Sequence, residues 1–111
     1  MEQIIEQVKE WKYIKQLPKE LFGFQLKYDM DTIGDAYYIF TYEDAKRRRK
    51  MSVYYHEETK EYKVKTKIGL TEFCNIDFIT SKLEDFEELL KTRFENSLKG
   101  IAIFDVNNLD S

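Results

Sequence analysis

Apolar and polar residues alternate over four segments in the middle of the chain, at residues 22–28, 36–42, 51–56 and 61–68. A period of two is typical of strands that bury one face. Turn-forming residues separate the segments, so we predict consecutive antiparallel strands joined in a meander.

Matching the apolar faces gives a register for the first two strands. A turn over residues 30–34 pairs Leu26 with Tyr38 and Phe24 with Phe40. A slip of one residue would put these side chains on opposite faces, so the pattern favours this register. It directs Tyr37 and Ile39 away from the predicted core.

The next two strands are joined by a predicted four-residue turn at 57–60. This turn sets Tyr55 opposite Tyr62 and Val53 opposite Val64 on the apolar face. Tyr54 and His56 then lie on the other face. Pairing Phe40 with Val53 between the second and third strands, and extending that register, puts Glu43 opposite Lys50 and Asp44 opposite Arg49, which neutralises part of the basic loop.

A fifth strand is predicted over residues 73–79. In this strand Cys74, Ile76 and Phe78 point toward the core, and Asp77 lies beside Lys65.

Two amphipathic helices flank the strands. Apolar residues recur at helical spacing over residues 4–14, and Leu17-Pro18 ends that helix. Ser81 and Glu84 form a capping box at the start of the second helix, and Gly100 is placed as its C-cap. The second helix carries one apolar stripe: Leu83, Phe86, Leu89, Leu90, Phe94 and Leu98.

The predicted fold class is α+β, a two-layer sandwich. A five-strand antiparallel meander carries an N-terminal and a C-terminal amphipathic helix on one face. Residues 1–111 form a single domain of ordinary size. The apolar segment 101–104 is a possible short C-terminal strand, and residues 105–111 are expected to be a loose tail.

The charge and composition of the chain exclude some classes of function. The net charge of −3 excludes a protein that is basic throughout and built for phosphate backbones, although a local basic surface stays possible. A single cysteine cannot form an internal disulfide, and no signal peptide or membrane span is visible. We expect a cytoplasmic protein with no membrane association.

No catalytic constellation is visible, so an enzyme is not expected. His56 and Cys74 fall on opposite faces of the predicted sheet, and one histidine cannot build a zinc site. Residues 29–40 are similar to a calcium loop at some positions, but Ile33 and Phe40 stand where oxygen ligands are needed. We expect no metal and no cofactor.

The open face of the sheet is the leading candidate site. Tyr37, Ile39, Tyr54 and His56 are predicted there, and outward aromatic and apolar residues favour a protein partner or a homodimer. The function predicted first is a small non-catalytic interaction module.

The alternative function is nucleic-acid binding. It would use Lys63, Lys65 and Lys67 on the open face and a basic hairpin loop that contains Arg47, Arg48 and Arg49.

Overall fold

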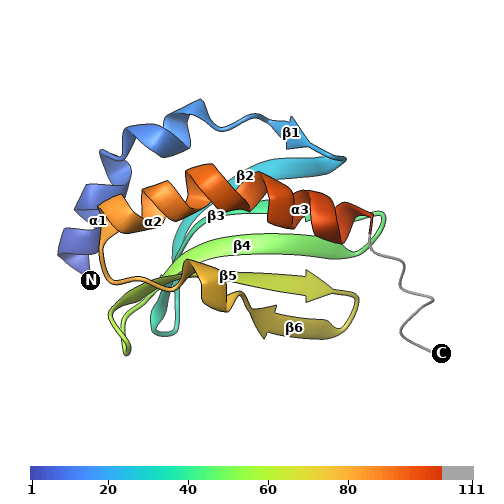
Figure 1. Ribbon diagram of the computed structural model, residues 1–111. Helices are drawn as coiled ribbons and strands as arrows, with labels where there is room; N and C mark the ends of the chain where they lie inside the picture. The colour runs from blue at the N-terminus through green and yellow to red at the C-terminus, as the bar shows by residue number, and fades with distance from the viewer. Residues whose placement is uncertain (104–111) are drawn as a thin grey trace.

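The computed structural model describes residues 1–103, and these residues form an open six-stranded antiparallel sheet with helices on one side (Figure 1). The strands lie in the sheet in chain order. They are β1 (Glu20–Leu21), β2 (Phe24–Ile33), β3 (Ala36–Asp44), β4 (Arg49–His56), β5 (Glu61–Ile68) and β6 (Thr71–Cys74). The predicted α+β meander is confirmed, with β1 as an additional strand.

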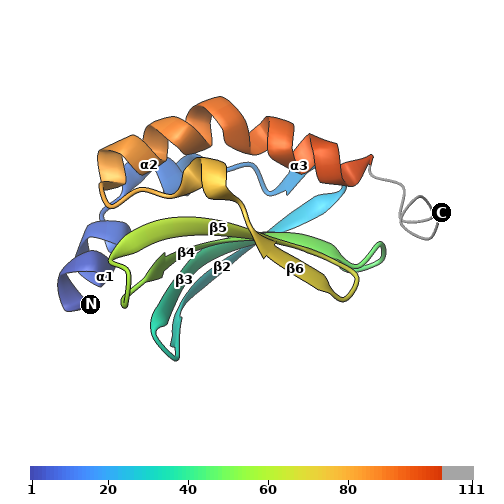
Figure 2. The ribbon, with the colours of Figure 1, turned by 60° about the horizontal axis from the view of Figure 1, so that its bottom comes forward.

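The N-terminal layer consists of α1 (Glu2–Lys9) and the 3₁₀ helix η1 (Lys12–Gln16). A short 3₁₀ helix, η2 (Ile76–Phe78), precedes α2 (Leu83–Leu89), the π-helical turn η3 (Leu90–Phe94) and α3 (Glu95–Ala102). The last three form one continuous rod above the sheet, and no helix of residues 1–103 lies on the opposite side (Figure 2). Within residues 1–103, no helix is both long and apolar enough to cross a membrane.

The core lies between the helices and the sheet. The predicted stripe of the C-terminal helix supplies Phe86, Leu90, Phe94 and Leu98, each at most 2% exposed. The sheet contributes Phe24, Phe40, Tyr42, Met51, Val53, Tyr55, Tyr62 and Val64. The apolar residues spaced at the helical period and those spaced at the strand period thus pack together in one hydrophobic layer.

The register of β4 with β5 is confirmed. Val53 lies opposite Val64, Tyr55 opposite Tyr62 and Tyr54 opposite Lys63. The predicted positions of Glu43 opposite Lys50 and of Asp44 opposite Arg49 are also confirmed between β3 and β4. Among residues 1–103 neither pair forms a salt bridge, and Asp44 pairs with Arg47 instead.

The register of β2 with β3 was predicted wrongly. Residues 30–33 continue β2, and the chain turns at Gly34-Asp35 instead, with Gly34 at a φ of 63°. This left-handed conformation suits glycine, which has no Cβ to clash. Tyr28 pairs with Phe40 and Leu26 with Tyr42, a shift of four positions that keeps the apolar faces together.

Two β-bulges interrupt the pairing around the middle of β3. Ile39 is an extra residue between the pairs Tyr38–Tyr54 and Phe40–Val53. β2 also has an extra residue opposite Ile39, between Tyr28 and Asp31, and Met30 in this bulge has a φ of 47°. Each bulge reverses which residues face the core beyond it, because two residues of one strand oppose one of its neighbour.

The predicted fifth strand is correct only at its start. β6 ends at Cys74, and the chain then enters η2, so Ile76 is exposed while Phe78 is buried. Lys65 pairs with Cys74 rather than with Asp77. The thiol therefore lies on the open side of the sheet, and the predicted burial of Cys74 is wrong.

The helix ends also differ from the prediction. The first helix ends at Lys9, and Trp11 is extended before η1 begins. No Ser81 capping box forms, since Lys82 is the N-cap of α2 and no side chain bonds there. Gly100 lies inside α3, which continues to Ala102, so residues 101 and 102 are helical and not a strand. Residues 104–111, which include the predicted tail, lie outside the described part of the chain.

Candidate functional site

The open face is the side of the sheet opposite the helices, and its side chains form rows across the strands; the row nearest the Gly34 turn is Ile33, Ala36, His56 and Glu61. From β2 toward β6 the next three rows are Asp31, Tyr38, Tyr54 and Lys63; Lys27, Thr41, Ser52, Lys65 and Cys74; and Gln25, Glu43, Lys50, Lys67 and Glu72. Alternation along each strand puts these residues on one side.

Two stacked tyrosines and a lysine occupy the middle of the open face. The rings of Tyr38 and Tyr54 are 5.3 Å apart and 25° from parallel. The Lys65 ammonium lies 4.8 Å from the centre of the Tyr38 ring and donates a 2.5 Å hydrogen bond to the Tyr38 hydroxyl. These contacts hold three long side chains in one arrangement before any partner binds.

The surroundings of this cluster shift the pKa values of Lys65 and Tyr54. Burial lowers the pKa of Lys65, but the Tyr38 hydroxyl and the Glu72 carboxylate outweigh burial, so the pKa of Lys65 is raised. Burial and the neighbouring Cys74 thiol raise the pKa of Tyr54. Lys65 is therefore a cation and Tyr54 a neutral hydroxyl over the whole physiological range.

The floor beside this cluster is small and polar. Thr41 donates hydrogen bonds to the Asp29 carboxylate at 2.7 Å and to the Ser52 hydroxyl at 3.0 Å. Longer side chains rise around these residues, leaving a hollow of about 480 Å³. Thr41 and Ser52 are only 6% and 4% exposed because the surrounding side chains cover them.

Charge is distributed unevenly over the open face. The half formed by β2 and β3 carries Asp29, Asp31 and Glu43 with one lysine, Lys27. The half formed by β4, β5 and β6 carries Lys50, Lys63, Lys65 and Lys67 with Glu61 and Glu72. One half is therefore net acidic and the other net basic.

Among residues 1–103, one group of side chains could bring metal ligands together. Ligand atoms of Asp35, His56 and Glu58 lie within 4.8 Å of one another. Both ring nitrogens of His56 already have partners: Nε2 is 2.8 Å from the Asp35 carboxylate, and Nδ1 is 3.0 Å from Lys63 Nζ. A metal would have to displace these contacts, and the group is exposed to water, so we assign no metal to it.

Two of the predicted partner-binding residues lie in the core. Tyr37 is 3% exposed and Ile39 is fully buried, so their predicted outward orientation is wrong. The bulge at Ile39 is the reason: the residue is inserted on the core side, and Tyr37 beyond it faces inward opposite Tyr55. Tyr54 and His56 lie on the open face as predicted.

Tyr38, like Cys74, is an open-face residue that the sequence prediction placed in the core. Its partner in β4 is Tyr54. The alternation pattern placed Tyr38 in the core with Phe40. The one available signal was the uninterrupted apolar run Ala36-Tyr37-Tyr38-Ile39-Phe40, which strict alternation does not explain and a bulge does.

Two arginines of the predicted nucleic-acid loop are engaged within the fold. Arg47 pairs with Asp44 and donates to the carbonyl oxygens of Phe22 at 2.9 Å and Ala102 at 2.5 Å. Arg49 is 7% exposed and donates to the carbonyl oxygen of Ile101 at 2.5 Å. Both cations thus stabilise the C-terminal end of α3, where the helix dipole is negative.

Arg48 is exposed, and Lys63, Lys65 and Lys67 lie on the open face as predicted. The guanidinium groups of Arg47 and Arg49 turn toward α3, whereas Arg48 lines a hollow together with Lys50 and Lys67.

Comparison with known proteins gives no relative: no protein-family model, no curated protein and no solved structure matches the chain.

Proposed function

We propose that the protein is a small non-catalytic interaction module and that its open face binds a second copy of the same chain. The unequal distribution of charge over the two halves of this face is the observation that carries the proposal. A surface with an acidic half and a basic half is complementary to itself across a two-fold axis.

The rows of the open face define how the two copies would meet. In the proposed dimer, the two-fold axis runs parallel to the strands and lies in the plane that separates the two copies. Seen along the sheet, it passes between β3 and β4. It lays β5 of one copy over β2 of the other, so Lys63 meets Asp31, and Lys65 meets Lys27, whose charge is paired with Asp29. It lays β4 over β3 in the same way, so Lys50 meets Glu43. Each such contact occurs twice, as in any isologous dimer.

The middle of the interface would be aromatic and preorganised. The same axis brings the Tyr38–Tyr54 stack of one copy onto that of the other. Tyrosines contribute much contact area at interfaces, and side chains already held by hydrogen bonds lose little entropy on binding. Charges dominate the rest of the face, so the dimer should weaken as salt is added.

Sedimentation velocity of the full chain at low and high salt tests the proposal, with two charge-reversal variants. Asp31→Lys with Glu43→Lys makes the face basic, and Lys50→Glu with Lys63→Glu makes it acidic. We expect the unmodified protein to dimerise at low salt, each variant to be monomeric, and an equal mixture of the two to form a heterodimer. Glu2→Lys with Glu88→Lys, two exposed positions on helices, is the matched control and should dimerise normally.

A chain that is monomeric in low salt at millimolar concentration contradicts the proposal, as does a mixture of variants that stays monomeric. If that monomer binds a single-stranded oligonucleotide with an affinity that falls steeply with salt, the open face belongs to the nucleic-acid alternative. Loss of oligonucleotide binding in the Lys50→Glu with Lys63→Glu variant would then locate that site.

A further inference from the structure

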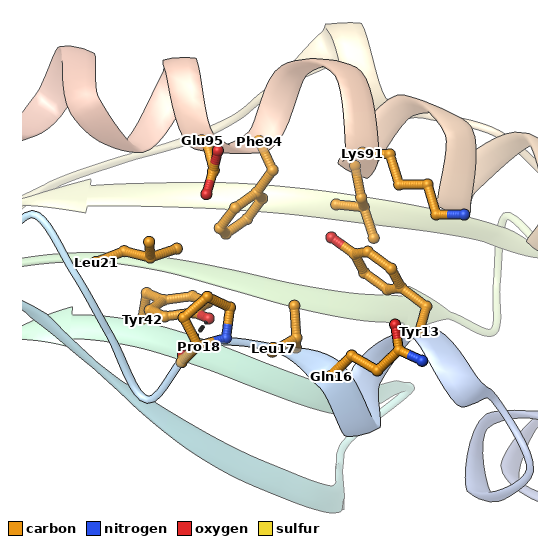
Figure 3. Close-up of a pocket in the computed structure, with 10 residues that line it drawn as sticks. Tyr13, Gln16, Leu17, Pro18, Leu21, Tyr42, Lys91, Phe94 and Glu95 are labelled. Carbon is orange, nitrogen blue, oxygen red and sulfur yellow. Dashed lines mark hydrogen bonds between the residues drawn. The ribbon is translucent and has the colours of Figure 1, made fainter.

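A pocket of about 290 Å³ lies on the helix side of the molecule, away from the open face (Figure 3). It lies between η1 and the segment that follows it, β1, and the π-helical turn η3. Leu17, Leu21, Leu90 and Phe94 make its apolar walls, and Tyr13 and Tyr42 add two further aromatic rings.

Local structure keeps this pocket open. The chain after η1 is extended at Leu17, and the Tyr42 hydroxyl holds it by donating a 2.6 Å hydrogen bond to the Pro18 carbonyl. On the opposite wall, η3 has the wider turn of a π-helix, and both Leu90 and Phe94 line the pocket from it. Single π-turns within α-helices occur often at functional sites.

The charges at the mouth of the pocket are not balanced. The Lys91 ammonium pairs with the Glu87 carboxylate at 3.0 Å, and Glu87 also accepts the Trp11 indole N–H at 2.6 Å. Glu95, also at the mouth, has no cationic partner within 4.0 Å among residues 1–103. Figure 3 shows the Glu95 carboxylate directed toward the pocket and the Lys91 side chain extending away from it.

Burial and this negative charge together raise the pKa values of the two tyrosines of the pocket. Burial, followed by the Glu87 and Glu95 carboxylates, raises the pKa of Tyr13 to about 12. Burial is also the main cause that raises the pKa of Tyr42, with Glu95 among the smaller ones. Both hydroxyls therefore stay neutral, and their oxygens can accept hydrogen bonds from a cation.

We propose that this pocket binds a small organic cation, an ammonium group carried by an alkyl or arylalkyl body. The ammonium would lie against the Glu95 carboxylate and the faces of the aromatic rings, which attract cations. The apolar body would fill the space between Leu17, Leu21 and Phe94. An anion of the same shape would be repelled by Glu95, and a neutral molecule would gain only the apolar contact.

The test is a titration of the isotope-labelled full chain, followed by amide NMR shifts, with three probes of one shape: benzylammonium, benzyl alcohol and benzoate. We expect saturable shifts at Tyr13, Leu21 and Glu95 with benzylammonium, about tenfold weaker binding of benzyl alcohol, and no shifts at these residues with benzoate. Glu95→Gln should weaken benzylammonium binding about tenfold and leave benzyl alcohol binding unchanged.

Glu88→Gln is the control, because Glu88 is exposed on the same helix and does not line the pocket. It should bind all three probes as the unmodified chain does. Equal affinity for the three probes, or no shifts at the pocket residues up to roughly 10 mM benzylammonium, overturns the proposal. The dimer measurement does not enter this result, because the pocket and the open face lie on opposite sides of the sheet.

Discussion

The β4–β5 and β2–β3 hairpins carry similar alternating sequences but differ in regularity. In β4–β5, every residue from Arg49 to His56 has one partner in the neighbouring strand. In β2–β3, the pairing is interrupted between Tyr28 and Asp31, and a second interruption at Ile39 separates β3 from β4.

The difference between the two hairpins limits what an alternation pattern can predict about the faces of a strand. Alternation assigns faces correctly along a regular strand, but a single inserted residue reverses the assignment beyond it. In β3 this exchange moves Tyr37 into the core and Tyr38 onto the open face. The candidate interaction surface therefore depends on the irregular hairpin as much as on the regular one.

The largest loss of stability is expected from substitutions in the core, where the two hairpins pack against the C-terminal helix. Phe40 and Phe86 are fully buried, so Phe40→Ala and Phe86→Ala should each lower the free energy of unfolding by about 3–5 kcal/mol. Tyr54→Ala, on the open face, should cost roughly 1 kcal/mol because its ring lies outside the core and stacks on Tyr38 beside Lys65. Urea denaturation measures all three, and an equal loss at Tyr54 would contradict its placement outside the core.

The next effect tests the bulge at Ile39 directly. Tyr37→Ser removes a buried ring and should cost about 2–4 kcal/mol, whereas Tyr38→Ser should cost roughly 1 kcal/mol or less. The two residues are adjacent and identical in type, so each is the control for the other in a urea titration. The opposite order would mean that β3 is regular and that the sequence prediction of its faces was right.

A smaller and pH-dependent effect is expected at the end of β3. Asp44 accepts the Arg47 backbone N–H at 3.0 Å and pairs with the Arg47 guanidinium, and these contacts hold the pKa of Asp44 below its ordinary value of 3.8. A lowered carboxyl pKa contributes stability above the ordinary value, and the contribution is lost as the pH falls through the lowered value.

Asp44→Asn should therefore cost about 1–2 kcal/mol at neutral pH, and the difference from the unmodified chain should shrink as the pH falls below 3.8. Thermal unfolding across this pH range measures it. Glu88→Gln, at an exposed position outside the open face with the same change in charge, is the control. A difference that stays constant with pH would show that the ionised carboxylate contributes nothing.

The smallest effects concern the turns that close the two hairpins. Gly34 closes β2–β3 with a φ of 63°, and a Cβ there would meet nothing within 4 Å, so Gly34→Ala should cost about 1 kcal/mol through backbone strain alone. Lys60 in the β4–β5 turn has a φ of 57°, so Lys60→Gly should stabilise the fold by about 1 kcal/mol or less. Changes of the same sign in both variants would contradict these turn conformations.

Several elements were predictable because their signals are local. The Val53–Val64 register follows from alternation on both sides of a short turn, and the helix stripe from Phe86 to Leu98 follows from a period that the chain itself carries. Of the candidate site, Tyr54, His56 and the three lysines of β5 were placed on the correct face for the same reason.

The fold class, the order of the strands and the apolar face of the regular hairpin follow from the sequence, because neighbouring residues carry the relevant periods. The two bulges, the burial of Tyr37 and Ile39, and the role of Arg49, whose partner Ile101 is 52 residues away, depend on how the chain packs in three dimensions. A bulge and a long-range hydrogen bond form where separate segments pack together. Their determinants are contacts between distant residues, so the apolar run from Ala36 to Phe40 signals an irregular strand without fixing which residue is inserted.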